Sequence, residues 1–444
     1  FKRNVGESGM DQLSLMCRDT DFPPMSLDIY ATPGAKIKVT GTNPLIYTWR
    51  VDSPVKEQQE HNRFIEDSRD LWDEFQRLAI KERSMRSASE AERKALRTKS
   101  DSISSIINQR ELKLMKELPI SNVWMEKLLR LSMSLKYNSR FTNKEEILAL
   151  YDRLNEEQKA SIEGQEIRVN LFPPKTVKEG DDMADADLFD LDGKVHHLAD
   201  FKGKYMLLDF WSSGCGPCIM ALPEMKEIQE QYKDRLTIIS LSSDTQTRWK
   251  AASTQHEMTW QNLSDLKQTA GLYAVYDVNG IPNYVLISPK GKIVKMWSGY
   301  GKGSLKLKMR RYLDAPKREM SITGDTNRKV VNYPSFESTN TDILEVKQVE
   351  LTDTATIVHF YAYYIPKYWI RVSPNCRLVD EKGETYTLKK ADGIKPGEHF
   401  YLPESGEAEF SLTFEPLSSS VQSFNFTEGT EKNDWQINRV RLNK

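Results

Sequence analysis

The chain has 444 residues, of which 39% are hydrophobic and 29% are charged, and its formal net charge is −1 at pH 7. A chain of this length exceeds one ordinary domain, and we expect roughly two to four domains. The balanced charge offers no electrostatic surface for nucleic acid or an acidic membrane, so neither is an expected partner. No run of roughly 18 apolar residues is present, so no segment is predicted to span a membrane.

The start of the chain and its cysteines bear on the cellular compartment. The sequence begins with Phe1 rather than Met, and we expect a signal segment or lipid anchor to precede this numbering. Four cysteines are too few for a secreted domain stapled by disulfides. Cys17 and Cys376 are expected to be buried or unpaired thiols, and a bridge between them is the alternative.

Residues 1–54 are predicted to form a β segment. Ser26–Tyr30 and Ala35–Gly41 alternate apolar and polar residues, and the turn sequence Thr32-Pro33-Gly34 lies between them. This arrangement predicts a hairpin. Because so short a β segment buries little surface alone, we expect it to pack on the following helices or to belong to a larger sheet domain.

Residues 55–173 are predicted to be a helical region. They are rich in Glu, Lys, Arg, Gln and Ala, and Ser87-Ala88-Ser89-Glu90 is a candidate helix cap. Phe172–Lys175, which contains two prolines, is predicted to be a linker. The stretches with helical character are Glu57–Arg83, Ser87–Leu118, Val123–Leu135 and Lys144–Leu154.

Residues 174–315 are predicted to form an α/β domain. The run Tyr205–Trp211 is nearly all apolar, as expected for a central strand buried on both faces. Leu236–Leu241 has the same character. Helices are predicted at Ile219–Tyr232, Trp249–His256 and Gly303–Leu313, and hairpins at Asp187–Leu198 and Tyr284–Met296.

Residues 316–444 are predicted to form a small β-sandwich. Short strand-like segments and turns alternate through this region. The predicted strands are Ile343–Val349, Ala355–Tyr363, Tyr368–Val372, Arg377–Val379, Thr385–Leu388, Ala408–Phe414 and Ser423–Thr427. The aromatic residues Tyr361, Tyr363, Tyr364, Tyr368 and Trp369 have the spacing of a sandwich core, and a ligand platform is the alternative interpretation.

The sequence Cys215-Gly216-Pro217-Cys218 lies between the predicted strand and the following helix. A helix that starts at Cys215 directs free N–H groups and partial positive charge at its sulfur, which stabilises the attacking thiolate. Cys218, one turn later, is placed to resolve a mixed disulfide. We therefore expect Cys215 to be the exposed nucleophile and Cys218 the buried resolving thiol of a redox disulfide, Cys215–Cys218.

Two other interpretations of the cysteine pair stay open at this stage. A structural zinc site needs two further Cys or His ligands, and none lies nearby in the sequence. A static structural disulfide is the second alternative. The redox interpretation requires no metal and no cofactor, and we expect none.

With Leu207-Leu208-Asp209-Phe210-Trp211 before it, the Cys215–Cys218 motif resembles the active-site strand and turn of thioredoxin. The flanking segments Leu198–Lys204 and Ile281–Val294 look like the TlpA/ResA branch, whose members are thioredoxin-fold oxidoreductases of the cell envelope. Tyr30–Gly41 is similar to a segment that precedes the thioredoxin domain in many such proteins. The resemblance implies a central mixed sheet flanked by helices over 174–315.

The resemblance also assigns roles to individual residues. Pro282 matches the cis-proline of the family, beside which the backbone of Ile281 pairs with a substrate strand. Asp209 matches the buried acid of thioredoxin, whose raised pKa suits it to take a proton from the resolving thiol; an Asp without a titrating role is the alternative. Pro223 matches a helix-kinking proline. The residues expected to contact a substrate are Trp211, Gly214, Gly216, Pro217, Ile281 and Pro282.

Two positions depart from the relatives. Gly214 stands where thioredoxins usually carry Trp, so a flat apolar rim is missing. Ala221 stands where some reducing members carry Glu, and we interpret the nearby Glu224 as a helix-surface carboxylate. A peroxiredoxin is not expected, because Leu208 and Ser212 occupy the places of its Pro and Thr ahead of the cysteine.

We therefore predict a thiol–disulfide oxidoreductase of the periplasm or cell envelope. It would reduce disulfides of exported proteins and receive electrons from a membrane thiol donor. The Gly-Pro dipeptide between the cysteines favours a low potential, near about −270 mV as in thioredoxin. The alternative is a binding or assembly protein of the cell envelope that uses the thioredoxin domain as a scaffold.

Overall fold

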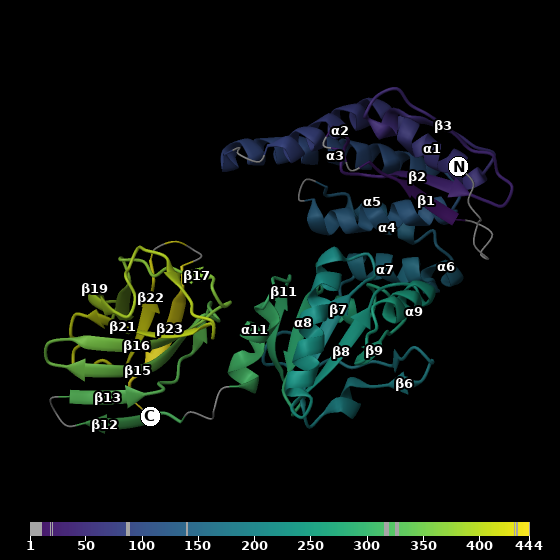
Figure 1. The fold of residues 1–444 in the computed structure, drawn as a ribbon. Helices are drawn as coiled ribbons and strands as arrows, with labels where there is room; N and C mark the ends of the chain where they lie inside the picture. Colours follow the sequence, from purple (N-terminus) through teal and green to yellow (C-terminus); the bar gives the residue numbers. More distant parts are fainter. Residues whose placement is uncertain are drawn as a thin grey trace. The chain divides into compact units, whose positions relative to one another are not determined.

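The computed structural model describes residues 11–17, 19, 21–85, 89–138, 141–314, 319–324, 328–429, 431 and 434–443 (Figure 1). Phe1, Ser87, Ala88 and the predicted boundary at 315/316 lie outside them. One compact unit contains the described residues up to Val177 together with Asp265–Asp277. The other contains Lys178–Ser264 and the described residues from Val278 onward. The division into 1–54, 55–173, 174–315 and 316–444 stays a prediction.

The N-terminal strands form two separate pairs, so the predicted hairpin is wrong. Strand β2 pairs antiparallel with β1, and β3 pairs antiparallel with β4. The Tyr30 N–H of β2 donates to the side chain of Gln58 at 2.8 Å, so β2 is held by a helix rather than by Ala35–Gly41. The four strands are β1 (Asp11–Leu15), β2 (Leu27–Ala31), β3 (Lys38–Thr40) and β4 (Arg50–Asp52).

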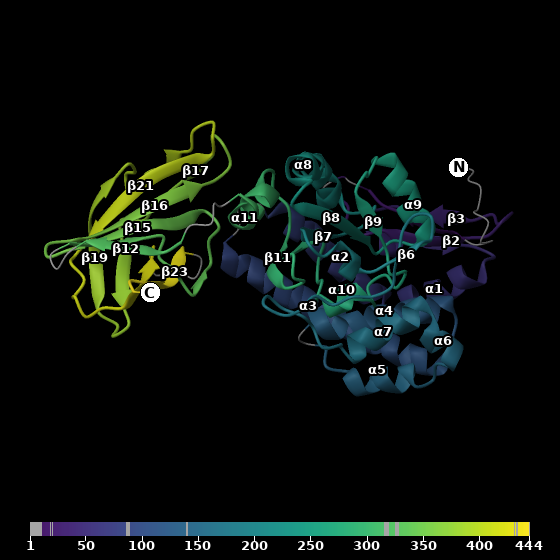
Figure 2. The same cartoon turned by 90° about the horizontal axis from the view of Figure 1, so that it is seen from below.

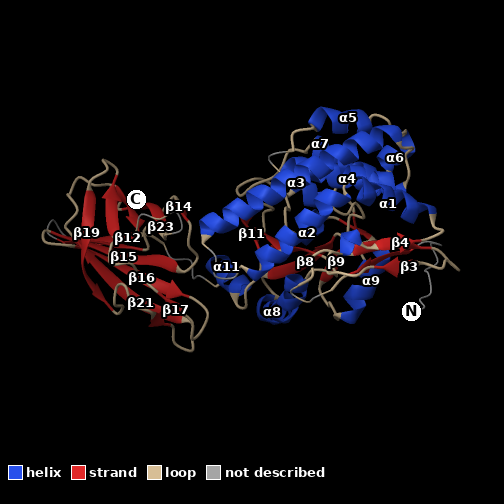
Figure 3. Cartoon of the chain, turned by 90° about the horizontal axis from the view of Figure 1, so that it is seen from above, coloured by secondary structure: helices blue, strands red, loops and turns tan. Residues whose placement is uncertain are grey.

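The rest of this unit is helical, and its core is built around Trp124, Leu128 and Ile147. Helix α4 packs against α5 and α7 (Figure 3). The stretch Glu57–Arg83 forms two helices, because the backbone leaves the helical region at Ser68 (φ −123°, ψ 24°). The helices are α1 (Lys56–Asp67), α2 (Arg69–Ser84), α3 (Glu90–Glu117), α4 (Asn122–Tyr137), α5 (Lys144–Tyr151), α6 (Glu156–Ala160), α7 (Ile162–Leu171) and α10 (Leu272–Val275).

The second unit begins with a mixed five-stranded sheet in the order β11-β10-β7-β8-β9. Strands β7, β8 and β9 are parallel, and β10 and β11 are antiparallel additions. The apolar run Tyr205–Trp211 is the central strand, as predicted. The elements are β5 (Leu188–Phe189), β6 (Val195–His196), β7 (Tyr205–Trp211), α8 (Gly216–Tyr232), β8 (Leu236–Ser242), α9 (Gln246–Gln255), β9 (Gln261–Leu263), β10 (Asn283–Ile287), β11 (Ile293–Ser298) and α11 (Ser304–Leu313).

The C-terminal region is all-β, and its sheet has the order β12-β13-β15-β16-β21-β19-β18-β22-β23-β14. Figure 2 shows β15, β16 and β21 next to one another, in this order. Side chains from both halves of the strand order, including Phe360 and Phe426, share one core, as in a sandwich. The strands are β12 (Ser321–Gly324), β13 (Arg328–Asn332), β14 (Ser338–Thr339), β15 (Leu344–Thr352), β16 (Thr356–Tyr363), β17 (Trp369–Ile370), β18 (Arg377–Asp380), β19 (Thr385–Asp392), β20 (Phe400–Tyr401), β21 (Glu407–Phe414), β22 (Ser423–Thr427) and β23 (Gln436–Arg441).

Glu224 of α8 is buried, so its interpretation as a surface carboxylate is wrong. Its two oxygens accept from the backbone N–H groups of Gly303 at 2.7 Å and Lys306 at 3.1 Å. Gly303 is the N-cap of α11 and has no side chain to provide a cap. The carboxylate of one helix therefore satisfies the free donors at the start of another and complements its partial positive charge.

The cap can be tested with an isosteric pair of substitutions. We expect Glu224→Gln to lower the free energy of unfolding by roughly 1–3 kcal/mol, because a buried charged acceptor is lost at two backbone donors. Glu227→Gln is the matched control: Glu227 is exposed and pairs with Lys306 at 2.8 Å, and such pairs contribute little. Urea denaturation monitored by circular dichroism measures both. Equal midpoints for the two variants would contradict the capping role.

Candidate active site

Cys215 and Cys218 form a disulfide with a Cα–Cα distance of 5.2 Å at the start of α8. Cys215 is the N-cap of the helix, and its sulfur accepts from the Cys218 N–H at 3.1 Å. The exposed fraction is 9% for Cys215 and 2% for Cys218. Cys215 is therefore the more accessible sulfur, although it is less exposed than the sequence analysis expected.

The turn before Cys215 is held by Asp244, a residue that the sequence analysis missed. The Ser213 N–H and hydroxyl donate to its two carboxylate oxygens at 2.6 and 3.0 Å. Asp244 follows the parallel strand β8, next to the end of β7. An acid directly after a buried strand, at the same sheet edge as the cysteines, is the signal that would have indicated it.

The six residues predicted to contact a substrate differ in accessibility. Gly214, Gly216 and Pro217 are exposed, and a Cβ built on either glycine meets nothing within 4 Å. Ile281 is half-buried, and the Ile281–Pro282 peptide bond is cis. Pro282 is buried. Trp211 is also buried, at 1% exposure, so a substrate would not reach its side chain in this structure.

Asp209 faces the helix that carries Cys218. It lies opposite Ser240 on β8 and Tyr284 on β10, so the three side chains share one face of the sheet. Leu207, two residues earlier on that face, shares a core with Met225 of α8. Burial raises the pKa of Asp209 from its usual range to about 7.

Two further buried residues form a hydrogen-bonded chain to Asp209. The Ser240 hydroxyl donates to Asp209 Oδ2 at 2.7 Å, and this bond opposes the increase of the Asp209 pKa. The Trp260 indole N–H donates to the Ser240 oxygen at 2.8 Å. Ser240 lies in an apolar strand, and its pairing with Asp209 depends on the register between two strands, so the sequence analysis missed it.

The zinc interpretation finds no support in the part of the chain that the structure describes. It contains no group of three or more His, Cys, Asp or Glu side chains that could hold a metal ion. His196 and His197 bond instead to Asp190 and Asp187. Cys17 and Cys376 are free thiols, and burial raises the pKa of Cys376 to about 12, which makes it unreactive.

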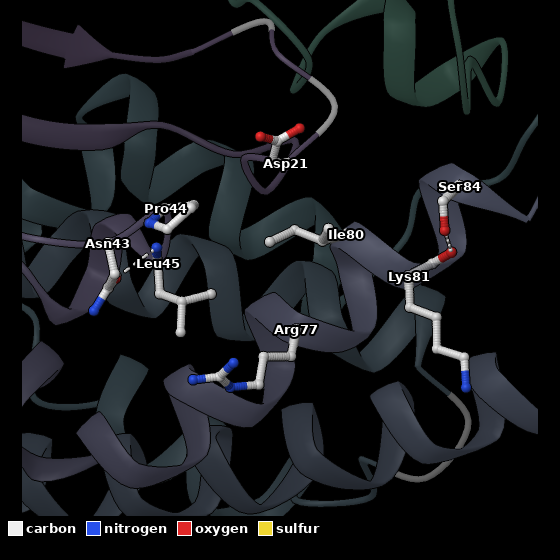
Figure 4. Close-up of a pocket in the computed structure, with 8 residues that line it drawn as sticks. All are labelled: Asp21, Asn43, Pro44, Leu45, Arg77, Ile80, Lys81 and Ser84. Atoms are coloured by element: carbon white, nitrogen blue, oxygen red, sulfur yellow. Dashed lines mark hydrogen bonds between the residues drawn. The ribbon is translucent and has the colours of Figure 1, made fainter.

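A surface pocket of about 490 Å³ lies in the compact unit that does not contain the Cys215–Cys218 disulfide (Figure 4). Two of its polar side chains are already engaged locally: Asn43 accepts from the Leu45 N–H at 2.8 Å, and Ser84 donates to the Lys81 carbonyl at 2.8 Å. Arg77 pairs with Asp73. The pocket therefore presents no convergent set of reactive groups comparable to the cysteine site.

Comparison with known proteins agrees with the redox interpretation of the Cys215–Cys218 pair. A family model described as the AhpC/TSA family matches residues 180–296. The thioredoxin-like protein YneN of Bacillus subtilis (strain 168) is 31% identical over 121 residues, which cover 26% of this chain and 69% of YneN. The thiol-disulfide oxidoreductase ResA of Geobacillus thermodenitrificans (strain NG80-2) is 32% identical over 139 residues, which cover 31% of this chain and 79% of ResA.

A solved structure, the thioredoxin domain of a thiol-disulfide oxidoreductase from Bacteroides vulgatus, is 28% identical and covers 31% of this chain and 100% of its own, with a TM-score of 0.29. The two curated relatives are matched over more than two thirds of their length, at the domain that holds the Cys215–Cys218 disulfide. This chain therefore belongs to the family of thioredoxin-like thiol–disulfide oxidoreductases that includes ResA and YneN.

Proposed function

We propose that this oxidoreductase reduces disulfides of exported proteins, with Cys215 as the nucleophile and Cys218 as the resolving thiol. The observation that carries the proposal is the position of Cys215: it caps α8, receives the Cys218 N–H at 3.1 Å and is the more exposed sulfur of the pair. The donors at a helix N-terminus stabilise a thiolate there.

The reaction begins with both cysteines reduced. The Cys215 thiolate attacks one sulfur of the substrate disulfide, and the other substrate sulfur leaves as a thiolate and takes up a proton. Cys218 loses its proton and attacks the Cys215 sulfur. This step closes the Cys215–Cys218 disulfide and releases the first substrate sulfur, so the substrate gains two electrons and two protons. A dithiol donor restores the enzyme by the reverse exchange.

Asp209 is proposed to accept the proton of Cys218. Its side chain lies on the sheet face that α8 covers, and burial raises its pKa to about 7, so it exchanges protons at neutral pH. Ser240 is proposed as a positioning residue, because its hydroxyl fixes Oδ2 of this carboxyl. Without that bond the carboxyl would be free to rotate, and its charged form would lose a donor.

The substrate is proposed to lie across the open rim of the site. Gly214, Gly216 and Pro217 are exposed there, and the backbone of Ile281 is proposed to pair with an extended substrate segment. Trp211 is proposed to support this rim from below, in keeping with its burial. The small residue at 214 leaves more room than an aromatic residue would, which suits a bulky polypeptide.

The proposed location is the periplasm or cell envelope, with a membrane thiol as the electron donor. This rests on the resemblance to ResA. Among the described residues, no helix is both long enough and apolar enough to cross a bilayer.

The proposal is tested by disulfide turnover with insulin as substrate. We expect Cys215→Ser to lower the rate by at least about a thousandfold, because the attacking thiolate is lost. Cys218→Ser should accumulate a mixed disulfide at Cys215, identified by mass spectrometry. Cys376→Ser is the matched control, since this thiol is buried and unreactive, and it should turn over insulin like the wild type. Equal turnover by wild type and Cys215→Ser would favour the scaffold alternative.

The direction of the reaction is tested by a redox titration of the Cys215/Cys218 pair. We expect a potential near about −270 mV, the value of thioredoxin, which carries the same Gly-Pro dipeptide. A potential near about −120 mV, typical of a strong oxidant, would reverse the assignment from reductase to oxidase.

The buried acid is tested by the pH dependence of stability in the oxidised protein. The folded protein holds the Asp209 proton up to about pH 7, whereas the unfolded chain releases it near pH 4. The contribution of Asp209 to stability is therefore fully present below about pH 4 and is lost as pH rises toward 7. Because Asn does not titrate, Asp209→Asn should gain roughly 2–4 kcal/mol relative to wild type between pH 4 and 8.

Denaturation midpoints at about pH 4 and about pH 8 measure this gain. Asp192→Asn, a substitution in an exposed turn, is the control. In the same titration Ser240→Ala should move the Asp209 transition to higher pH, because the hydroxyl that favours the charged form is gone. Ser253→Ala, a buried serine that bonds the Trp249 carbonyl instead, should not move it. A pH-independent difference between wild type and Asp209→Asn would rule out a raised pKa.

A further inference from the structure

A small two-stranded sheet in the C-terminal region exposes three large aromatic side chains. Tyr368, Trp369 and Tyr401, on or beside β17 and β20, are 57%, 46% and 63% exposed. Within the described part of the chain, these are the exposed Trp and Tyr side chains. The interpretation of Tyr368 and Trp369 as sandwich core is therefore wrong, and the ligand-platform alternative stays open for them.

The exposed side chains are held in place by their neighbours. The Trp369 indole stacks on the His399 ring with centroids 3.9 Å apart and an interplanar angle of 20°. The Tyr401 and His399 rings meet edge to face, with their centroids 6.5 Å apart. The Leu402 N–H donates to the Tyr368 carbonyl at 2.8 Å and fixes the backbone. Trp369, His399 and Tyr401 thus form an aromatic patch whose ring contacts limit the entropy lost on binding, and Tyr368 precedes it in the chain.

The charges beside the aromatic patch compensate one another. Lys367 pairs with Glu404 at 2.7 Å, and Lys395 pairs with Glu398. The surroundings therefore favour neither a polyanion nor a polycation. Exposed Trp and Tyr with a neutral polar rim are the side chains that dominate polypeptide binding surfaces.

Contacts connect the aromatic patch to the redox site within the same compact unit. The side chain of Ile365, three residues before Tyr368, lies over Gly303, where a Cβ would come within 3.3 Å of it. Arg310 of α11 reinforces this packing by pairing with Glu407 at 2.9 Å. Gly303 ends the loop that starts at Gly299, and the Gly299 N–H donates to the Pro282 carbonyl at 2.8 Å. The loop 299–303 therefore contacts the cis-proline segment at one end and Ile365 at the other, and the Ile365 carbonyl accepts from the Tyr368 N–H, one residue before Trp369.

We propose that the aromatic patch binds an unfolded segment of the polypeptide whose disulfide reacts at Cys215. The inference rests on the proposed function, because it names the substrate as an unfolded polypeptide rather than a small disulfide. We choose a polypeptide as the ligand of the patch for two reasons. The surface is aromatic and its charges are compensated, and the loop 299–303 connects Ile365, shortly before the patch in the chain, to the Pro282 segment. The patch adds affinity for the substrate without touching the reacting sulfurs.

Direct binding is measured with a probe that cannot exchange disulfides: fluorescently labelled, reduced and S-carboxymethylated α-lactalbumin. Fluorescence anisotropy should give the same Kd for the wild type and Cys215→Ser. The double variant Trp369→Ser/Tyr401→Ser should bind about five- to tenfold more weakly, since central aromatic residues carry much of such binding. Phe172→Ser, which removes an exposed aromatic side chain of the other unit, should keep the wild-type Kd.

Turnover then links binding to catalysis. For Trp369→Ser/Tyr401→Ser, the ratio of kcat/KM for insulin to kcat/KM for 5,5′-dithiobis(2-nitrobenzoic acid) should fall about five- to tenfold, through a higher KM for insulin. Circular dichroism and the melting temperature verify that the variant is folded.

Two results would overturn the inference and leave the proposed function intact. The first is an unchanged Kd and an unchanged ratio in the double variant, while insulin turnover still requires Cys215. The second is binding of chitohexaose, but not of the unfolded polypeptide, which would make the patch a glycan site. Insulin turnover that survives Cys215→Ser would instead overturn the proposed function, and with it this substrate assignment.

Discussion

The chemistry of this protein depends on one junction, where the buried strand β7 ends and α8 begins at Cys215. The helix must start there for its free N–H groups to face the sulfur, and Pro217 suits the first turn because it has no N–H to leave unsatisfied. The junction is fixed from both sides: Asp244 binds the turn through Ser213, and Glu224 fastens α8 to the start of α11. If the Asp244 or the Glu224 contact shifted, the Cys215 sulfur would move away from the N-terminus of α8.

Strand β7 also places the carboxyl group of Asp209 in the protein interior, where water does not solvate it. Six of the seven residues of β7 are buried, and Asp209 is one of them. A buried carboxylate without a partner is costly, and the structure meets this cost with a single hydroxyl donor, Ser240, rather than with a cation. The carboxyl is therefore stabilised enough to ionise, but not enough to remain ionised at all pH values, which is the condition that proton exchange requires.

Local patterns were sufficient for much of the fold and for the reacting pair. The apolar run of β7 and the C-x-x-C spacing each lie within a few consecutive residues, so local patterns could predict them. The cis bond at Ile281–Pro282 was expected only from the family resemblance. The partners Ser240, Trp260 and Asp244 could not be predicted in this way, because strand register brings them together. Glu224 was misjudged because its cap belongs to another helix, 79 residues further along the chain.

The C-terminal region illustrates the limit of periodic patterns. Alternation along β16 correctly indicated a sandwich, and Phe360 and Phe426 do pack in its core. The alternation gives no information about where a strand leaves the sandwich. After Tyr363 the chain enters the separate β17–β20 pair, so Tyr368 and Trp369 follow the same pattern but lie on the surface. The N-terminal hairpin failed for a similar reason, since β2 found its partner upstream.

The hydrogen-bonded chain beneath α8 also has a direction. An indole N–H can only donate, so the Ser240 oxygen accepts from Trp260, and its hydroxyl donates to Asp209 Oδ2. In the ionised carboxylate, Oδ2 is thereby already an acceptor, which leaves Oδ1 as the oxygen for a further donor. If Asp209 takes the proton of Cys218 as proposed, Oδ1 is therefore the oxygen that would receive it.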